Sequence, residues 1–450
     1  MTLYNLLQEN HRAGKIIRAG IVGAGQMGEG LACQMEMMYG MRATAIADIV
    51  PDRARQTFES ANVPPEQVIE TSDASLAATA MAEGRRVATT DSSMLAGLPG
   101  LDIVVEATGV PEVGAQVTLN AILNRKHVLQ MNVETDATVG YLLRSLARAA
   151  NVVYSLSAGD EPGSTMELFD FASSLGFKVI CAGKGKNNPL DRTANPDTVA
   201  EEARAKQMNP KMLASFKDGT KTMVEMTSLG NAIGFVPDVR GMHGPKATRD
   251  TLAQVYIPQE EGGILEQTNV VEYGLGIAPG VFVVFTTDHP KIVRDLQYLS
   301  MGKGPYWALY RPYHLTSLET PISIARAVLN SETTVATDRP PVAETITVAK
   351  QALKAGAKID SLGGFSVYGL IERADVAHRE NLLPLGLAAG SRLVRDMPQG
   401  SILTYDDVEL DDSLTIVHLR RLQDQLAASN SGIEPVSLAK TINAKLAAPA

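Results

Sequence analysis

Cysteine and long apolar runs are both scarce in this sequence. Its 450 residues contain two cysteines, Cys33 and Cys181, fewer than a disulfide framework uses, so we expect a reducing compartment and two core thiols. The apolar run Val281 to Phe285 is far shorter than the roughly 20 residues that span a bilayer. Residues 1–15 contain no apolar segment of the signal-peptide type. We therefore expect a cytoplasmic protein without a membrane partner.

Positive charge is also in short supply. The formal net charge is -9, which argues against a nucleic-acid partner because neutralising phosphates needs a basic surface. The patterns HExxH, GxSxG, metal-spaced CxxC and Walker A are missing, which excludes the usual zinc, serine-hydrolase and P-loop functions. With 45% hydrophobic and 20% charged residues, the composition is that of a globular protein, and the length predicts two or three domains.

A glycine-rich motif follows the first apolar run. Ile16 to Val22 leads directly into Gly23, Ala24, Gly25, Gln26, Met27 and Gly28, a GxGxxG pattern between a strand and a helix. The first glycine permits the tight turn, the second lets backbone N–H groups approach a pyrophosphate, and the third lets helix and strand pack closely. The motif predicts a Rossmann domain that binds a nicotinamide dinucleotide, with Gly23 to Gly28 as its cofactor-binding turn.

The residues after the second expected strand bear on cofactor preference. Asp48 stands at the tip of the strand Arg42 to Ala47, where an acidic residue normally accepts hydrogen bonds from ribose hydroxyls and favours NAD. Arg53 and Arg55 follow closely, and either one could bind a 2'-phosphate. The same arginines could instead be a solvated first helical turn, so the sequence leaves NAD and NADP both open.

Three later strands extend the expected parallel sheet, at Leu101 to Glu106, Lys126 to Met131 and Val152 to Leu156. Ligands of such sheets bind outside the carboxyl ends of the strands. We therefore expect cofactor contacts, as opposed to ordinary loop positions, at four residues: Thr108, Gly109, Asn132 and Glu134. Between the second helix and these strands, residues 72–97 are expected to add a strand or hairpin without a catalytic role.

Adjacent carboxylates begin the middle of the chain. Asp160 and Glu161 lie between an expected strand and a helix that we place at Met166 to Leu175. Such a pair can bind a divalent cation or act in acid–base chemistry. The alternative is that Asp160 or Ser164 only caps the helix.

The best substrate-site candidate is a loop expected after the strand Phe177 to Ala182. It contains two lysines and two amides among glycines: Lys184, Lys186, Asn187 and Asn188. Ammonium charges and loop N–H groups that converge in this way bind anions. The alternative is a solvent-exposed basic turn.

A third polar segment contains Asp218, Lys221 and Glu225 at spacings of three and four. This spacing puts all three on one face of a helix. They are either a surface ion-pair ladder or a charged inner face, where a lysine of lowered pKa would donate protons.

Two further loops, rich in glycine and proline, contribute cations. We expect them to anchor an anionic substrate through five residues: Arg240, His243, Lys246, Lys303 and Arg311.

The chain is expected to have an α/β fold in three consecutive domains. Residues 1–156 form a Rossmann doubly wound parallel sheet, and residues 157–340 form a central α+β substrate and oligomerisation domain. Residues 341–450 form a small β-rich domain, in which Val342 to Leu353 has helical periodicity. A homo-oligomer is expected because exposed β-rich modules often pair.

The C-terminal run Leu385 to Val408 resembles the SAF domain, a β-clip module, in its Arg395-Asp396-Met397-Pro398 start and its Leu403-Thr404-Tyr405-Asp406-Asp407 end. Together with the GxGxxG turn, this resembles the homoserine-dehydrogenase-like oxidoreductases that carry a C-terminal SAF domain. Within them the chain is similar to 1-deoxy-D-xylulose 5-phosphate reductoisomerase-like enzymes.

The resemblance implies conversion of 1-deoxy-D-xylulose 5-phosphate to 2-C-methyl-D-erythritol 4-phosphate, a step of isoprenoid biosynthesis, with NADPH and a divalent metal such as Mg or Mn. Asp160 and Glu161 would then bind the metal, and Lys184 and Lys186 would polarise the carbonyl or bind phosphate. Arg240, Lys246 or Arg311 would complete the phosphate anchor. The metal-binding pattern of the usual reductoisomerases is missing here. Alternatives are an NAD(P)-dependent dehydrogenase or oxidoisomerase of another sugar acid or a homoserine-like substrate, and a non-catalytic dinucleotide-sensing regulator.

Overall fold

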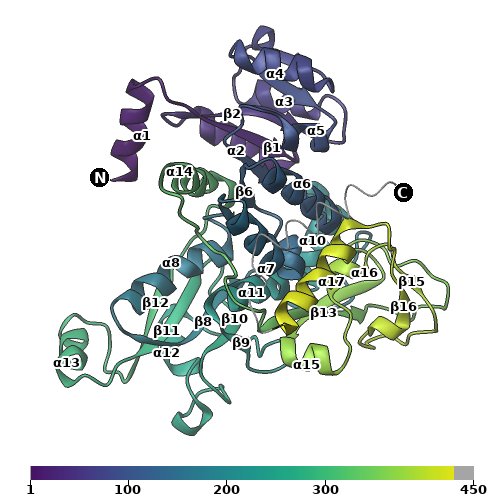
Figure 1. Cartoon of the computed structure of the whole chain (residues 1–450). Coiled ribbons are helices and arrows are strands. Elements are labelled where there is room, and N and C mark those ends of the chain that lie inside the picture. Colours follow the sequence, from purple (N-terminus) through teal and green to yellow (C-terminus); the bar gives the residue numbers. More distant parts are fainter. Residues whose placement is uncertain (1, 430–450) are drawn as a thin grey trace. The chain divides into compact units, whose positions relative to one another are not determined.

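The computed structural model describes residues 2–429, and these residues divide into two compact units (Figure 1). The first unit comprises residues 2–160, 315–338 and 414–429, and the second comprises residues 161–314 and 339–413. This division differs from three consecutive domains, because the chain returns to the first unit twice. No helix among residues 2–429 is long and apolar enough to cross a membrane.

The first unit is built on a seven-stranded parallel sheet in the order β3-β4-β2-β1-β5-β6-β7. Its strands are β1 (Ile17–Val22), β2 (Met41–Ala47), β3 (Val68–Glu70), β4 (Arg86–Thr89), β5 (Ile103–Glu106), β6 (His127–Gln130) and β7 (Tyr154–Leu156). The chain order reverses between β1 and β5, which is where open α/β sheets bind their ligands. This confirms the expected Rossmann-type sheet.

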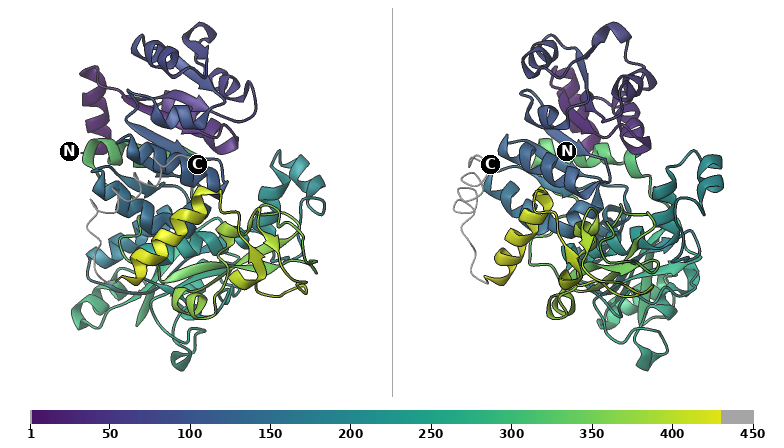
Figure 2. Two further views of the ribbon diagram at one scale, coloured as in Figure 1. Left: turned by 45° about the vertical axis from the view of Figure 1, so that its right-hand side comes forward. Right: turned by 90° about the vertical axis from the view of Figure 1, so that its right-hand side faces the viewer.

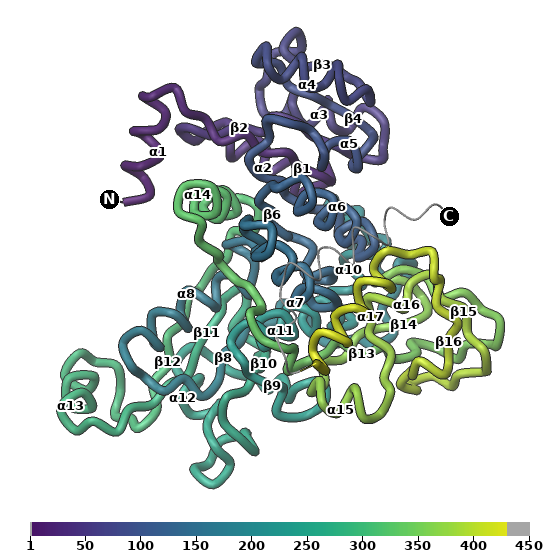
Figure 3. Tube along the Cα trace, viewed as in Figure 1, coloured from purple at the N-terminus to yellow at the C-terminus, as the bar shows by residue number. Residues whose placement is uncertain are grey.

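Helices complete this unit, and two of them come from distant parts of the chain. They are α1 (Leu3–Arg12), α2 (Gln26–Glu36), α3 (Arg53–Ser60), α4 (Ala74–Ala82), α5 (Ser92–Gly97), α6 (Pro111–Leu123), α7 (Val133–Ala149), α14 (Thr320–Asn330) and α17 (Thr415–Ala428). Figure 3 shows α14 in green among the blue and purple elements that begin the chain. In Figure 2, α17 is the yellow helix, and its Gln423 side chain donates to the carbonyl oxygen of Thr138 in α7 at 3.0 Å.

The second unit contains a mixed five-stranded sheet in the order β12-β11-β8-β10-β9. Its strands are β8 (Lys178–Lys186), β9 (Val236–Pro237), β10 (Val270–Leu275), β11 (Val281–Thr286) and β12 (Tyr306–Arg311). β8 pairs parallel with β10 and antiparallel with β11. The helices are α8 (Glu161–Ser174), α9 (Ala200–Ala205), α10 (Pro210–Lys217), α11 (Thr220–Ile233), α12 (Leu252–Val255) and α13 (Pro290–Tyr298).

Two apolar layers cover this sheet. On one face, side chains of α8 and α11 pack with Val271, Phe285 and Trp307. On the other, Leu252 and Tyr256 pack with β8 and with Phe282 of β11. Both faces are therefore buried, and a polar side chain that points inward from β8 needs polar partners.

The C-terminal part of the second unit is small and β-rich, as expected. It contains two antiparallel pairs, β13 (Ala343–Ala349) with β14 (Val367–Arg373), and β15 (Arg392–Leu393) with β16 (Val408–Glu409). The short helices α15 (Ala374–Arg379) and α16 (Leu385–Ala388) lie between them in sequence. The likeness of this region to an SAF module stays a prediction.

Three local predictions were wrong. Residues 343–349 form β13 and not a helix, because every side chain of this segment is buried and Thr345 to Val348 are β-branched. β8 continues through Lys186, so Lys184 and Lys186 lie in a strand and not in a loop. Residues 306–311, expected in a loop, also form a strand.

The extra strand expected within residues 72–97 is present. It is β4, which lies inside the parallel sheet between β3 and β2.

Candidate functional site

The glycine turn of the first unit has the geometry that a bound pyrophosphate requires. Gly23 has φ of 98°, and a Cβ there would lie 2.8 Å from the carbonyl carbon of Ala107. A Cβ at Gly28 would overlap the carbonyl oxygen of Gly23, whereas one at Gly25 would meet nothing within 4 Å. α2 begins at Gln26, and Met27 is partly exposed at its first turn. The space in front of Gly25 and the helix N-terminus therefore fit a phosphate group.

The carboxylate of Asp48 is hydrogen-bonded to the protein's own backbone. It accepts hydrogen bonds from the N–H of Ala24 at 2.7 Å and from the N–H of Val50 at 2.8 Å. The guanidinium of Arg53, in the first turn of α3, lies 3.7 Å away and is 47% exposed. Asp48 thus stabilises the glycine turn, and Arg53 stays accessible beside it.

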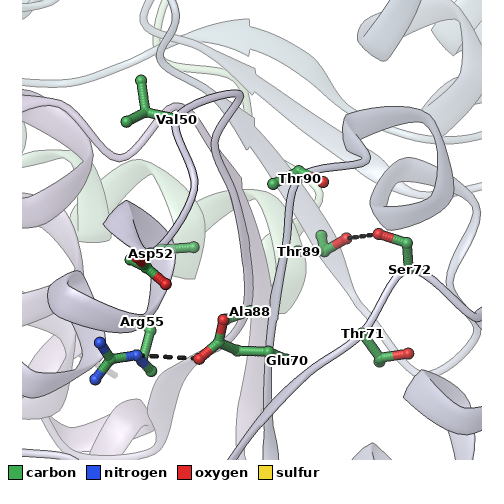
Figure 4. A pocket seen from close by; sticks show the side chains of 10 residues that line it. Val50, Asp52, Arg55, Glu70, Thr71, Ser72, Ala88, Thr89 and Thr90 are labelled. Carbon is green, nitrogen blue, oxygen red and sulfur yellow. Dashed lines mark hydrogen bonds and ion pairs between the residues drawn. The ribbon is translucent and has the colours of Figure 1, made fainter.

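A pocket lies at the carboxyl ends of β2, β3 and β4 (Figure 4). Four hydroxyl side chains line it, those of Thr71, Ser72, Thr89 and Thr90, together with Val50, Asp52, Ala54, Arg55, Glu70 and Ala88. Arg55 forms an ion pair with Glu70 at 3.0 Å, and the hydroxyls of Ser72 and Thr89 lie 3.2 Å apart, as the dashed lines show. Sequence reasoning missed these hydroxyls, although the polar pair Thr89-Thr90 directly after an apolar strand was a usable signal.

The four other expected cofactor residues border the carboxyl ends of β5 and β6. Thr108 donates its N–H to Glu106 at 2.9 Å, and Gly109 has φ of 68°. Asn132 is the N-cap of α7, and its side chain accepts from the N–H of Thr135 at 3.2 Å. Glu134 is buried in the first turn of the same helix. All of them belong to loops or helix starts at the ligand-binding edge of the sheet.

The second unit contains a buried charge cluster around Lys184. The Lys184 ammonium donates to the carboxylates of Glu161, the first residue of α8, and of Glu225 in α11. His314 Nε2 lies 3.5 Å from the Glu161 carboxylate, and Lys221 Nζ lies 4.0 Å from that of Glu225. The side chains of Lys184, Glu161 and Glu225 are 6%, 13% and 2% exposed.

The charge state of Lys184 follows from these contacts. Burial alone would lower the pKa of Lys184, but the two carboxylates outweigh burial and raise the pKa above its ordinary value. Lys184 is therefore a permanent cation at neutral pH. The glycines on both sides of Lys184 matter here, because a Cβ at Gly183 would overlap Glu272 of β10 and one at Gly185 would overlap Ala278.

Lys186 lies two residues further along β8 and differs from Lys184. Its ammonium donates to the carbonyl oxygens of Asn188 at 2.8 Å and Phe216 at 2.7 Å. Burial, together with the nearby charge of Lys184, lowers the pKa of Lys186 to about 8. Asn187 is exposed and Asn188 half-buried. Lys186 can therefore exchange a proton near physiological pH.

Asp218 does not share a helix face with Lys221 and Glu225, so that prediction was wrong. Asp218 is the C-cap of α10, and Gly219, with φ of 87°, separates it from α11. Its carboxylate is fully buried and forms an ion pair with Lys350 at 2.7 Å. Burial raises the pKa of Asp218 although Lys350 opposes this. Lys221 and Glu225 are correctly placed on one face of α11.

The expected substrate anchors lie in separate places. Arg240 forms ion pairs with Glu372 and Glu380, and Lys303 lies on an exposed loop. Lys246 is exposed and forms a bridge with Leu275, which also pairs with Lys186. Lys246 and Lys186 are thus both paired with the same residue of β10, Leu275.

Two other anchors have acidic partners. Arg311 lies 3.2 Å from the hydroxyl of Ser164 and 3.0 Å from the carboxylate of Glu167, both on α8. His243 Nδ1 lies 2.8 Å from the fully buried Glu272, and this hydrogen bond raises the pKa of His243. Arg311, the last residue of β12, therefore contacts the helix that begins with Glu161.

The carboxylates near Lys184 include part of the expected metal set. Of the two expected metal ligands, Glu161 accepts a hydrogen bond from Lys184, and Asp160 is the residue directly before it in the chain. Glu225 and His314, which were not among the predicted site residues, contribute from elements that only the fold brings together. Because the Lys184 ammonium lies between both carboxylates, a divalent ion that used both would take the place of this ammonium. Metal binding at Asp160 and Glu161 stays a prediction.

The fold and the two sites together define a class of protein. The first unit is of the Rossmann type and has a glycine turn with room for a phosphate, and the second unit has a buried centre of lysines and carboxylates. Residues 159–320 match the family model described as "Oxidoreductase DRL, catalytic domain". The chain is thus an oxidoreductase, and the matched segment contains Glu161, Lys184, Lys186, Glu225 and His314.

Solved structures add a distant likeness. A probable dehydrogenase from Thermotoga maritima is 14% identical, with a TM-score of 0.41, over 70% of this chain and 90% of that one. Scyllo-inositol dehydrogenase from Lactobacillus casei, solved with NAD(H) and scyllo-inositol, is 13% identical, with a TM-score of 0.41, over 72% of this chain and 92% of that one. Similarity at this level supports no conclusion about substrate. No curated protein matches the chain in sequence.

Proposed function

We propose that this protein uses a nicotinamide dinucleotide to oxidise or reduce a small, anionic, hydroxylated substrate, with Lys184, Glu161 and Glu225 as its catalytic centre. The observation that carries the proposal is the Lys184 ammonium held between two buried carboxylates in the segment that matches an oxidoreductase catalytic domain. Buried ionisable groups whose pKa is perturbed by charged partners are typical of active sites.

Each member of the centre has a distinct role. Lys184, fixed as a cation, polarises a substrate carbonyl and stabilises the alkoxide. His314 beside Glu161 provides a route for a proton to solvent, since His314 is half-buried. Lys186, whose pKa is about 8, binds the anionic group of the substrate in its protonated form.

The glycine turn is the proposed dinucleotide site. The absent side chain at Gly25 leaves room for a pyrophosphate, and Gly28 lets the helix pack closely against Gly23, so the residues fit this cofactor. A bound nicotinamide dinucleotide supplies or accepts the hydride. NADP is the preferred form in this proposal, because Asp48 already accepts two backbone N–H groups and Arg53 is exposed beside it.

Two substrate assignments remain to be separated. The resemblance to reductoisomerase-like enzymes favours 1-deoxy-D-xylulose 5-phosphate with Mg or Mn, with Asp160, Glu161 and Glu225 as the carboxylates for the metal. The matched description names an oxidoreductase and no reductoisomerase, so it supports the alternative, a dehydrogenase of another sugar acid, better than the reductoisomerase. A regulator without turnover is disfavoured, because a sensor has no need of the buried Lys184 centre.

The deciding experiment is a turnover assay. Purified protein is incubated with 1-deoxy-D-xylulose 5-phosphate and NADPH, with and without manganese, and absorbance at 340 nm is followed. Consumption of NADPH with formation of 2-C-methyl-D-erythritol 4-phosphate supports the reductoisomerase. Turnover only with other sugar acids and NAD(P) supports the dehydrogenase, and no turnover with either class contradicts the proposal.

A further inference from the structure

One buried acid of the first unit has no role in the site described above. Glu106 is the last residue of β5 and is 0% exposed. It pairs with Val22, the residue directly before the glycine turn, in the register of β1 and β5. Glu106 therefore lies at the central strand pair of the sheet, at the edge where ligands bind.

The two carboxyl oxygens of Glu106 differ. Oε1 accepts the N–H of Thr108 at 2.9 Å. Oε2 is buried and has no hydrogen-bond partner among residues 2–429. An unpartnered buried oxygen is costly, and each such atom in a folded protein calls for an explanation.

The peptide that Glu106 holds is also the surface on which the glycine turn packs. A Cβ at Gly23 would lie 2.8 Å from the carbon and oxygen of Ala107 and 3.0 Å from the nitrogen of Thr108. The N–H of Ala107 in turn donates to Val22 at 2.8 Å. A shift of the Thr108 peptide would therefore move the turn that receives the pyrophosphate.

The surroundings of Glu106 disfavour its charge. Burial raises the pKa of Glu106 to about 7, the contact with Thr108 opposes this, and the charge of Glu134 on α7 raises the pKa further. On β7, Tyr154 donates to Asp136 of α7 at 3.0 Å, so the groups that face Glu106 are acidic or neutral. Ionisation of Glu106 would add a second negative charge next to a site for an anionic dinucleotide.

We propose that Glu106 is a proton-linked positioning residue for the dinucleotide. Its buried carboxyl accepts the Thr108 N–H and so fixes the peptide on which the glycine turn packs, and its ionised form weakens dinucleotide binding because it adds a negative charge at the edge where the anionic cofactor binds. The proposal rests on the cofactor assignment made above. If binding requires the neutral form, the Kd scales with one plus the ratio of ionised to neutral Glu106. For a pKa of about 7, this ratio makes the Kd about tenfold larger at pH 8 than at pH 6.

The experiment measures NADH binding to the full chain by titration calorimetry from pH 6 to pH 8.5. NADH is the probe because it lacks the 2'-phosphate, whose own ionisation near pH 6 would add a pH dependence. The wild type should show the tenfold weakening, and Glu106→Gln should bind with the same Kd at every pH. Glu83→Gln, an exposed residue that follows α4, is the control and should keep the wild-type slope.

A second measurement uses the wild type alone. Calorimetry at pH 7.5 in two buffers of different ionisation enthalpy gives the protons taken up on binding, expected to be about 0.8 per NADH. NADH binding without proton uptake, or with the same slope in Glu106→Gln, overturns this inference and leaves the cofactor assignment intact. If neither NADH nor NADPH binds at any pH, the cofactor assignment fails and this inference fails with it.

Discussion

Replacing Lys184 by methionine tests whether the buried centre is held together by charge. Methionine keeps most of the side-chain length but removes the ammonium, and it leaves Glu161 and Glu225 facing each other in a buried site. Removing one partner from a buried ion pair costs about 3–5 kcal/mol of unfolding free energy. We expect Lys184→Met to lose an amount in this range at pH 8, measured by chemical denaturation of the full chain.

Repeating this measurement at acid pH predicts how the loss of stability depends on pH. Without Lys184, burial and mutual repulsion raise the folded-state pKa values of both carboxyl groups above their unfolded values. A raised acid pKa destabilises the folded protein most at high pH, so the loss should be smaller at pH 5 than at pH 8. Lys178→Met, at the exposed start of the same strand, is the control and should change stability by less than about 0.5 kcal/mol. An unchanged stability of Lys184→Met, or a loss that grows toward acid pH, would refute the reasoning.

Three other perturbations have defined outcomes. Gly28→Ala should weaken dinucleotide binding at least about a hundredfold, because its Cβ would overlap the carbonyl oxygen of Gly23, and unchanged binding by calorimetry would remove the turn from the site. Asp48→Ala should lower the melting temperature and weaken NADH and NADPH alike, since Ala24 and Val50 lose their acceptor. A selective loss of NADPH would contradict this bracing role. Lys186→Met should raise KM more than it lowers kcat. In the wild type we expect KM to rise above pH 8 as Lys186 loses its proton, and the variant should lack this rise; a rise retained in the variant would exclude Lys186 from substrate binding.

Much of the first unit could be predicted from the sequence, because its signals are local. The strand, glycine turn and helix at residues 16–36 follow each other directly, and the Rossmann sheet follows from this pattern. The strand at 343–349 was missed because its polar residues Glu344, Thr345 and Thr347 are buried by other elements. Periodicity in such a segment does not distinguish a strand from a helix.

The proposed catalytic centre could be predicted only in part. Lys184, Lys186 and Glu161 were found because charged residues stood next to glycines and strand ends. The pairing of Lys184 with Glu225, 41 residues away, and of Glu161 with His314 depends on how α8, α11 and β8 pack. Long-range pairings of this kind leave no trace in a single sequence.

The division of the chain into units also could not be predicted from local sequence patterns. Residues 320–330 and 415–428 look like ordinary amphipathic helices, and nothing in them says that they belong to the first unit. Their attachment depends on tertiary packing: Ile324, Ala325 and Ala327 of α14 lie in the apolar core of the first unit, and the N–H of Ile416 in α17 donates to Glu112 of α6 at 2.8 Å.

The central claim is that Lys184 catalyses a nicotinamide-dependent reaction. The most direct measurement compares wild type, Lys184→Met and Lys178→Met. It follows kcat from the absorbance change at 340 nm, with whichever substrate the turnover assay identifies, and the Kd of the dinucleotide by calorimetry. The account predicts that Lys184→Met loses at least about a hundredfold in kcat while its Kd for the dinucleotide stays within about twofold. Turnover by Lys184→Met at the rate of Lys178→Met would contradict it.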